Sequence, residues 1–283
     1  FNVPVSDKSD ILFCDRAVAV QCPYIEAEAA IASHTISTAT GAGWIWDIGL
    51  QKRRGIGHVY SSKHMGADEA AQNLRNYVGK QMDQLDVRHI KYTPGHRKKF
   101  WVKNCVAVGL AAGFVEPLEA SSILLIEISA FWIAEKLPHK KSGFANCEKQ
   151  FNETFRYRWD TIIEFLKLHY CISRRTDTDF WRDNIHPDSI PATLLEKLVL
   201  WREQCPSVVD FLSRADVFPF ESYCYILYGM NYKTATHAVG DAHLNMLEKR
   251  IHNQQRNMAG LINTLPKNRA LINKIREYGL QRI

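Results

Sequence analysis

The 283-residue sequence lacks the features that define several protein classes. Its seven cysteines are an odd number and include no CxxC pair, which argues against a disulfide framework or a zinc site and fits the reducing cytoplasm. The histidines do not have the spacing of metal ligands, so we expect no metal site. No apolar run reaches the ~18 residues of a membrane span, because Glu127 interrupts the most apolar stretch, and we expect no membrane partner.

A concentrated patch of positive charge is also missing. The net charge is +6, but the basic residues are scattered and no recognisable nucleic-acid-binding module occurs. The densest basic cluster, residues 91–103, is typical of a solvated strand face. We therefore expect no nucleic-acid partner. The hydrophobic content of 46% and the charged content of 23% are those of an ordinary globular protein.

The residue pattern predicts an α+β fold in two parts. One helix is expected at about residues 68–85. Short strands are expected at residues 11–14, 17–20, 43–50, 57–61, 87–92, 99–102 and 104–109, with 87–92 and 99–102 in one sheet. Helices are expected at residues 118–137, 147–170, 191–204, 207–214, 221–228, 244–261 and 267–278. The change in composition near residue 140 predicts a sheet-bearing domain at 1–140 and a helical domain at 141–283.

Residues 104–119 are the most informative stretch. The pattern predicts a buried strand, a loop with Gly109 and Gly113, and a helix whose first turn holds Pro117 and two carboxylates, Glu116 and Glu119. The start of a helix exposes unpaired backbone N–H groups, which can hold an anion or an electron-rich cofactor. By itself, a glutamate at such a position is most often a residue that compensates the helix dipole.

This stretch resembles the flavin-dependent tryptophan halogenases. Three further stretches carry the same resemblance in the family's order, at residues 43–48 (GWIWDI), 55–62 (GIGHVYSS) and 168–181 (LHYCISRRTDTDFW). The resemblance implies an α/β cofactor part with a mixed sheet, like that of flavin monooxygenases, followed by a helical part that covers the substrate. It implies FAD as the cofactor and chloride or bromide as the co-substrate.

Two pieces of the family pattern are absent from this sequence. The family has a GxGxxG fingerprint for FAD and a catalytic lysine in its N-terminal part, and neither motif occurs here. The chain also begins at Phe1, in a stretch typical of the middle of a fold. We therefore expect the sequence to be the C-terminal part of a longer protein, and we expect this part alone to be inactive.

The resemblance assigns residues to the reaction centre. Glu119 corresponds to the family's glutamate at the site of halogen transfer, where a carboxylate can stabilise a cationic arene or accept its proton. The backbone N–H groups of Ser121 and Ser122 correspond to those that face the halide. Predicted flavin contacts are Gly109, Leu110, Gly113 and Ile123. Without the resemblance, the glycines are ordinary turn residues, the two aliphatic residues are core, and the serines are one helix turn.

The resemblance also assigns a substrate site. Trp44 and Trp46, on one face of a predicted strand, correspond to a family signature between flavin and substrate. In a later aromatic segment, Glu221 is expected to pair with a substrate ammonium, and Tyr223 and Tyr225 to sandwich the ring. The alternative is an ordinary aromatic cluster. Two departures from the family are Gly49 in place of proline and Ala120 in place of serine.

The implied function is FAD-dependent halogenation of an electron-rich arene, tryptophan or another indole, with a separate flavin reductase as partner. A flavin-dependent hydroxylase and a non-catalytic flavin-binding relative are the alternatives. A homodimer is among the states that the sequence allows. The substrate, the ring position and the choice between chloride and bromide are left open.

Overall fold

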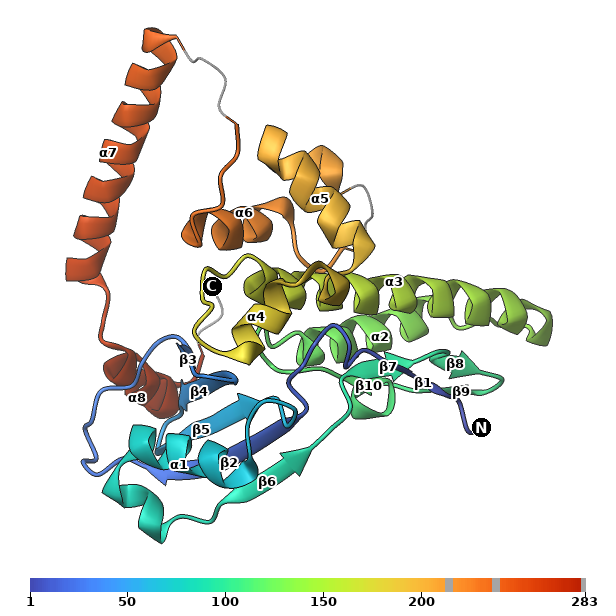
Figure 1. Ribbon diagram of the computed structural model, residues 1–283, viewed down its shortest axis with the longest axis horizontal. Coiled ribbons are helices and arrows are strands. Elements are labelled where there is room, and N and C mark those ends of the chain that lie inside the picture. The colour runs from blue at the N-terminus through green and yellow to red at the C-terminus, as the bar shows by residue number, and fades with distance from the viewer. Residues whose placement is uncertain (212–215, 236–239, 281–283) are drawn as a thin grey trace.

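The computed structural model describes residues 1–211, 216–235 and 240–280. Its helices and antiparallel sheets confirm the predicted α+β class. Figure 1 shows the largest sheet at the bottom of the view, the long helix α3 above it, and α7 standing apart at the left. In chain order, the strands come first and most of the helices follow.

The largest sheet has five antiparallel strands in the order β3-β4-β5-β2-β6. Alternation of β-branched and small residues lets β2 and β5 bury one set of side chains, such as Val18 and Ile56, in the core. Helix α1 (Ala67–Val78) covers this sheet through Ala70 and Leu74 and leads into η1 (Lys80–Gln84). The strands are β2 (Arg16–Pro23), β3 (Ile36–Ala39), β4 (Gly43–Gly49), β5 (Arg53–Tyr60) and β6 (Arg88–Lys91).

A smaller three-stranded sheet has the order β1-β7-β10 and is accompanied by the hairpin of β8 and β9. Gly113 on β10 lies opposite His96, and a Cβ atom there would lie 2.6 Å from the Gly95 carbonyl oxygen. The close pairing of these strands therefore requires glycine. The strands are β1 (Val5–Asp7), β7 (Gly95–Arg97), β8 (Trp101–Val102), β9 (Cys105–Val106) and β10 (Gly113–Phe114).

The helical part is organised around α3, which runs between α2 on one side and α5 and α6 on the other in Figure 1. α3 buries one aromatic stripe, including Phe151, Phe155 and Trp159, at the spacing of a helix face. The helices are α2 (Ser122–Lys136), α3 (Phe144–Cys171), α4 (Asp179–Ile185), α5 (Ala192–Glu203), α6 (Phe220–Gly229), α7 (Asp241–Thr264) and α8 (Asn268–Tyr278), with 3-10 turns η2 (Gly109–Ala111), η3 (Lys141–Gly143), η4 (Pro187–Ser189) and η5 (Val208–Asp210).

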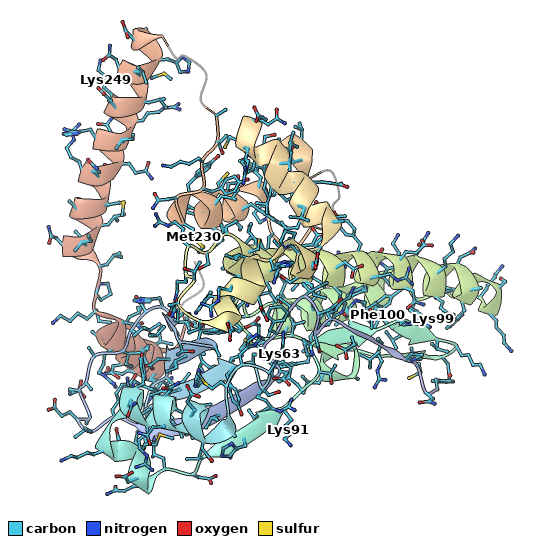
Figure 2. All side chains as sticks on the ribbon, viewed as in Figure 1. Lys63, Lys91, Lys99, Phe100, Met230 and Lys249 are labelled. Carbon is cyan, nitrogen blue, oxygen red and sulfur yellow. The ribbon has the colours of Figure 1, made fainter. Side chains whose placement is uncertain are left out.

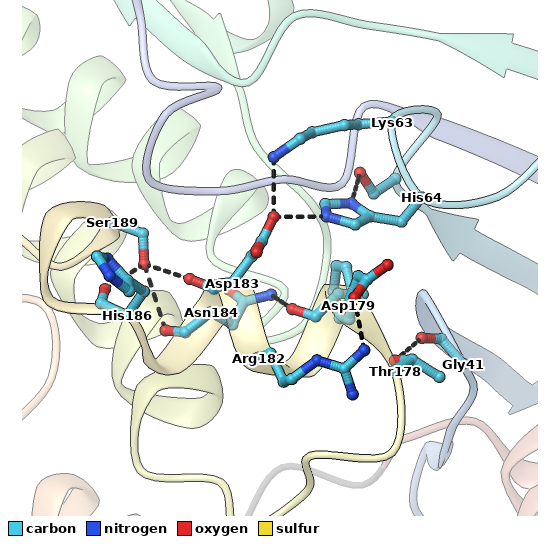
Figure 3. Close-up of polar contacts among 12 residues, drawn as sticks. Gly41, Lys63, His64, Thr178, Asp179, Arg182, Asp183, Asn184, His186 and Ser189 are labelled. Carbon is cyan, nitrogen blue, oxygen red and sulfur yellow. Dashed lines mark hydrogen bonds and ion pairs between the residues drawn. The ribbon is translucent and has the colours of Figure 1, made fainter.

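Hydrophobic packing joins the two parts. One cluster contains Leu12, Phe100 and Trp101 from the first part and Phe151 and Trp159 from the second. A boundary at residue 140 stays a prediction, and this cluster crosses it. Polar contacts add a second link, shown in Figure 3: Asp183 of α4 accepts hydrogen bonds from Lys63 Nζ at 2.8 Å and His64 Nε2 at 3.0 Å, from the loop after β5.

Three strand predictions are wrong. Residues 11–14 form a turn and coil, from which Leu12 and Cys14 are buried in two different core clusters. The two strands expected in one sheet lie in different sheets, because β6 pairs with β2 whereas β8 pairs with β9. The predicted buried strand at 104–109 shortens to β9, in which Cys105 is exposed. Short apolar runs do not specify their pairing partner, which explains these errors.

The helix starts differ from prediction in one place that matters for the site. The helix expected to begin at Leu118 begins at Ser122, so Glu116, Pro117 and Glu119 lie in the turn before α2 and not in its first turn. The helix expected at 68–85 ends at Val78, because Gly79 has a φ of 82° and the chain continues as η1. The remaining predicted helices are found within a few residues of their expected ends. An exception is the helix expected at 207–214, where the described residues form only η5, and residues 212–215 lie outside the described chain.

Within the described residues, no helix is both long and apolar enough to cross a membrane. The same residues contain no group of three or more His, Cys, Asp or Glu side chains that could hold a metal ion.

Candidate functional site

A buried carboxylate connects the WxW strand to α3. Glu116 Oε2 accepts hydrogen bonds from Trp44 Nε1 at 2.8 Å and from the Tyr170 hydroxyl at 2.6 Å. All three side chains are at most 4% exposed. Burial raises the pKa of Glu116, while the hydrogen bonds from Tyr170 and Trp44 act in the opposite direction. Glu116 therefore fixes the ring of Trp44 against α3.

Trp46 lies on the same face of β4 as Trp44, as the alternation of strand residues predicts. The two rings meet edge to face with their centroids 6.2 Å apart. The ring of Trp46 covers Gly57 on β5, where a Cβ atom would lie 2.1 Å from Trp46 Cζ2. The position of Trp46 thus depends on a glycine in the neighbouring strand.

Glu119 forms an ion pair with His169, one turn from the end of α3. Glu119 Oε1 lies 2.7 Å from His169 Nε2, and His169 Nδ1 lies 2.8 Å from the carbonyl oxygen of Phe165. Because a carbonyl oxygen can only accept, Nδ1 carries a proton and donates it to Phe165. The ion pair lies in a partly exposed position, with 29% of the Glu119 side chain and 15% of the His169 side chain exposed.

An open hollow of about 760 Å³ is lined by His169 of this pair and by Leu118, the residue before Glu119. Trp44, Leu118 and Tyr170 form part of its wall together with His169, and Arg174 also lines it. The hollow is large enough for an aromatic molecule, and its wall combines aromatic faces with a few polar groups.

The start of α2 carries the predicted halide-binding residues. Ser121 is the N-cap of α2, and no side chain caps the helix. The first N–H groups of α2 are thus available to an anion. Ala120, directly before them, has a φ of 49°, a left-handed conformation that places the turn after Glu119 under strain. The positions of Ser121 and Ser122 are compatible with the predicted role, which stays a prediction.

The predicted flavin contacts divide into two kinds. Leu110 is 79% exposed and Ile123 is 76% exposed, so neither is a core residue. Leu110 lies in η2 and Ile123 in α2. A Cβ atom added to Gly109 of η2 would lie 3.2 Å from Ile126 Cδ1 of α2, so the two elements pack closely together. Gly109 has a φ of 62°, which favours glycine. An exposed apolar surface beside a helix start fits the flat ring of a flavin. Gly113, in contrast, is explained by the pairing of β10 with β7.

The aromatic residues of α6 are not placed as the predicted sandwich requires. Tyr223 is 2% exposed and packs against Phe165, Trp201 and Phe211, whereas Tyr225 is 80% exposed. Residues two apart on a helix point in nearly opposite directions, so these two rings cannot sandwich one ligand. Glu221 and Tyr225 instead line another hollow of about 400 Å³, which shares Gly229 with the hollow at Trp44.

Sequence reasoning missed His169 as the partner of Glu119, since it considered the histidines only as metal ligands. It also gave Glu116 no role beyond a charge near a helix start. The family-like stretch 168–181 contains both His169 and Tyr170. It was the only signal in the sequence for the contacts of His169 with Glu119 and of Tyr170 with Glu116. Their partners lie about 50 residues earlier, so no local pattern connects them.

Comparison with known proteins shows the family to which the chain belongs. A sequence model described as tryptophan halogenase matches residues 1–245. The chain is 34% identical over 230 residues to the tryptophan 6-halogenase SttH of Streptomyces toxytricini, a match that covers 81% of this chain and 43% of that protein. It is 41% identical, with a TM-score of 0.94, to the structure of a tryptophan halogenase from Shewanella frigidimarina, covering 99% of this chain and 54% of the other.

A further similar structure is BrvH, a flavin-dependent halogenase from Brevundimonas, with a TM-score of 0.86, 32% identity, and coverage of 97% of this chain and 55% of the other. The chain spans about half the length of the relatives that it matches. Since the family's sequence model covers most of the chain and its relatives share the fold, the chain belongs to the tryptophan halogenase family.

Proposed function

We propose that the intact protein is an FAD-dependent halogenase that acts on tryptophan or another electron-rich indole with chloride or bromide. The observation that carries the proposal is the pair of Glu119 and His169 beside the hollow walled by Trp44. The names of the relatives support it, since they include tryptophan 6-halogenases and tryptophan 7-halogenases.

Halogenation of an arene ends with loss of a proton from the ring carbon. In the proposed reaction, the Glu119 carboxylate faces the arene, stabilises its positive charge and accepts that proton. His169 orients the carboxylate, because its Nδ1 is fixed to the Phe165 carbonyl group. The first N–H groups of α2 supply a binding position for the halide near Glu119.

FAD fits the exposed surface formed by Gly109, Leu110 and Ile123. When bound and reduced, it would supply the oxygen chemistry that turns the halide into an electrophile. A separate flavin reductase is the proposed source of reduced flavin. The chain's own residues then position the arene, hold the halide and remove the proton.

The test compares the intact protein with its Glu119→Gln variant. With reduced FAD, O2, tryptophan and chloride or bromide, we expect a product with the mass and isotope pattern of a halogen. Loss of the carboxylate should lower kcat by about 10²–10⁴-fold. Glu127→Gln, at an exposed position on α2, is the matched control and should leave kcat unchanged.

Two results would contradict the proposal. Oxygenated products that form equally well without halide would identify a hydroxylase, an alternative to which the departures Gly49 and Ala120 give some support. A normal halogenation rate in Glu119→Gln would remove the proposed role of Glu119. Circular dichroism of both variants establishes that any loss of activity does not come from misfolding.

A further inference from the structure

A second open hollow, of about 910 Å³, adjoins the hollow at Trp44. The two share three lining residues, Ser173, Arg174 and Met230. Figure 2 shows Met230 at the end of α6, where that helix approaches the loop after α3. A molecule whose aromatic end lies against Trp44 can therefore extend past Met230 into the second hollow.

The second hollow combines an apolar wall with unpaired positive charge. Leu195 and Val199 of α5 contribute to the apolar side. Arg174, Arg202 and Lys233 also line it, and all three are exposed. None of the three side chains forms an ion pair or hydrogen bond within the described chain, and no acidic residue is among those that line the hollow there.

Arg175, the residue after Arg174, shows the contrasting case. Its guanidinium group makes two hydrogen bonds to Asp177, at 3.0 and 2.6 Å, and a third to the Thr40 carbonyl oxygen. Its charge is therefore neutralised and its geometry is fixed by the fold. Arg174 has no such structural use, which leaves its charge free for a ligand.

The wall that carries Lys233 is held in place before any ligand arrives. The Thr234 hydroxyl donates to the Trp201 carbonyl oxygen at 2.7 Å, and the Ala235 N–H donates to that of Arg202 at 2.6 Å. The Tyr232 hydroxyl donates to the Leu198 carbonyl oxygen at 2.5 Å. These bonds tie residues 232–235 to α5 and keep Lys233 and Arg202 on one rim, so a ligand would bind to a preformed surface.

We propose that this second hollow binds the anionic tail of a substrate whose aromatic end occupies the hollow at Trp44. This inference rests on the proposed function and narrows it: the substrate is an indole attached to an extended, partly apolar tail that ends in a carboxylate or a phosphate. The apolar wall contacts the tail, and Arg174, Arg202 and Lys233 bind its charged end.

The experiment measures binding of three probes of equal length by isothermal titration calorimetry. All three begin with N-acetyltryptophanyl-glycyl-glycine. The first ends in alanine amide, the second in alanine with a free carboxylate, and the third in a phosphoserine that replaces the alanine. We expect both charged probes to bind at least about tenfold more tightly than the amide, with an advantage that falls as salt rises. A larger advantage for phosphate identifies a phosphate tail, and an equal one indicates that a single negative charge suffices.

The variant that tests the assignment replaces all three cations, as Arg174→Gln, Arg202→Gln and Lys233→Gln. It should abolish the advantage of the charged probes. The matched control replaces Lys249, Arg250 and Arg256 of α7 by glutamine, which removes the same charge from a helix that Figure 2 places away from Met230. It should keep the advantage.

Equal binding of all three probes, or an advantage that survives in the first variant, would overturn the inference. Halogenation of free tryptophan and of the three probes is measured in parallel. If halogenation occurs without any preference for charged probes, only the inference fails. If no halogenation occurs while the preference remains, the proposed function fails and the anion site stands.

Discussion

At the scale of the residue, Glu116 fixes two side chains of the site, because its buried Oε2 atom accepts hydrogen bonds from both Trp44 and Tyr170. Glu116→Ala leaves two buried donors without an acceptor and should lower the free energy of unfolding by roughly 2–5 kcal/mol. Glu116→Gln keeps an acceptor and should cost clearly less. Urea unfolding at pH 7 measures both, and equal losses in the two variants would contradict this role.

The pH dependence of Glu116 gives a second readout of the same contact. Its pKa in the folded protein lies above the ordinary value of 4.5 because of burial. The folded state therefore binds this proton more tightly than the unfolded state. The contribution of this proton to the free energy of unfolding is full below pH 4.5 and is lost as pH rises through the folded pKa. Relative to Glu116→Gln, the wild-type protein should become less stable as pH rises above 4.5. Parallel stability curves would contradict the assignment.

At the scale of the element, the pairing of β4 with β5 positions the WxW face. Gly57→Ala places a methyl group where the Trp46 ring lies, so the ring must shift. We expect a loss of about 1–3 kcal/mol in stability and a shift in tryptophan fluorescence. Gly55→Ala on the same strand is the control, since its added Cβ meets no atom within 4 Å. A similar effect of both variants would indicate a general cost of replacing glycine and not a contact with Trp46.

At the scale of the whole molecule, Lys167 links three segments. This buried ammonium on α3 donates to Asn184 Oδ1 of α4 at 2.8 Å and lies 4.7 Å from the ring centre of Phe13 in the N-terminal segment. Burial lowers the pKa of Lys167 from 10.5 to about 8. Between these values the unfolded state binds more protons, so stability should rise with pH.

The measurement compares the wild-type protein with Lys167→Met by thermal or urea unfolding from pH 7.5 to 10.5. Relative to the variant, the wild-type protein should gain on the order of 3 kcal/mol across this interval. If the difference in the free energy of unfolding between the two proteins stays constant with pH, burial does not lower the pKa of Lys167 in the folded state.

Much of the helical part could be predicted from sequence. The aromatic stripe of α3 repeats at helical spacing over many residues, and Pro138 separates α2 from the next helix, so local patterns suffice there. The same reasoning predicted that Trp44 and Trp46 share a face, because alternation in a strand is a local property. Local patterns were weakest for two-residue strands such as β9, where sheet pairing and not propensity decides the conformation.

The sequence by itself determined the α+β class, most of the helices and, through ordered motifs, the resemblance to the halogenase family. Only the tertiary structure decided that Glu119 meets His169, that Glu116 holds Trp44, and that Tyr223 and Tyr225 face different surroundings. The physical reason is that hydrogen bonds between residues about 50 to 70 positions apart depend on how α3 packs against the sheet. That packing is the sum of many apolar contacts, and no single stretch of sequence encodes it.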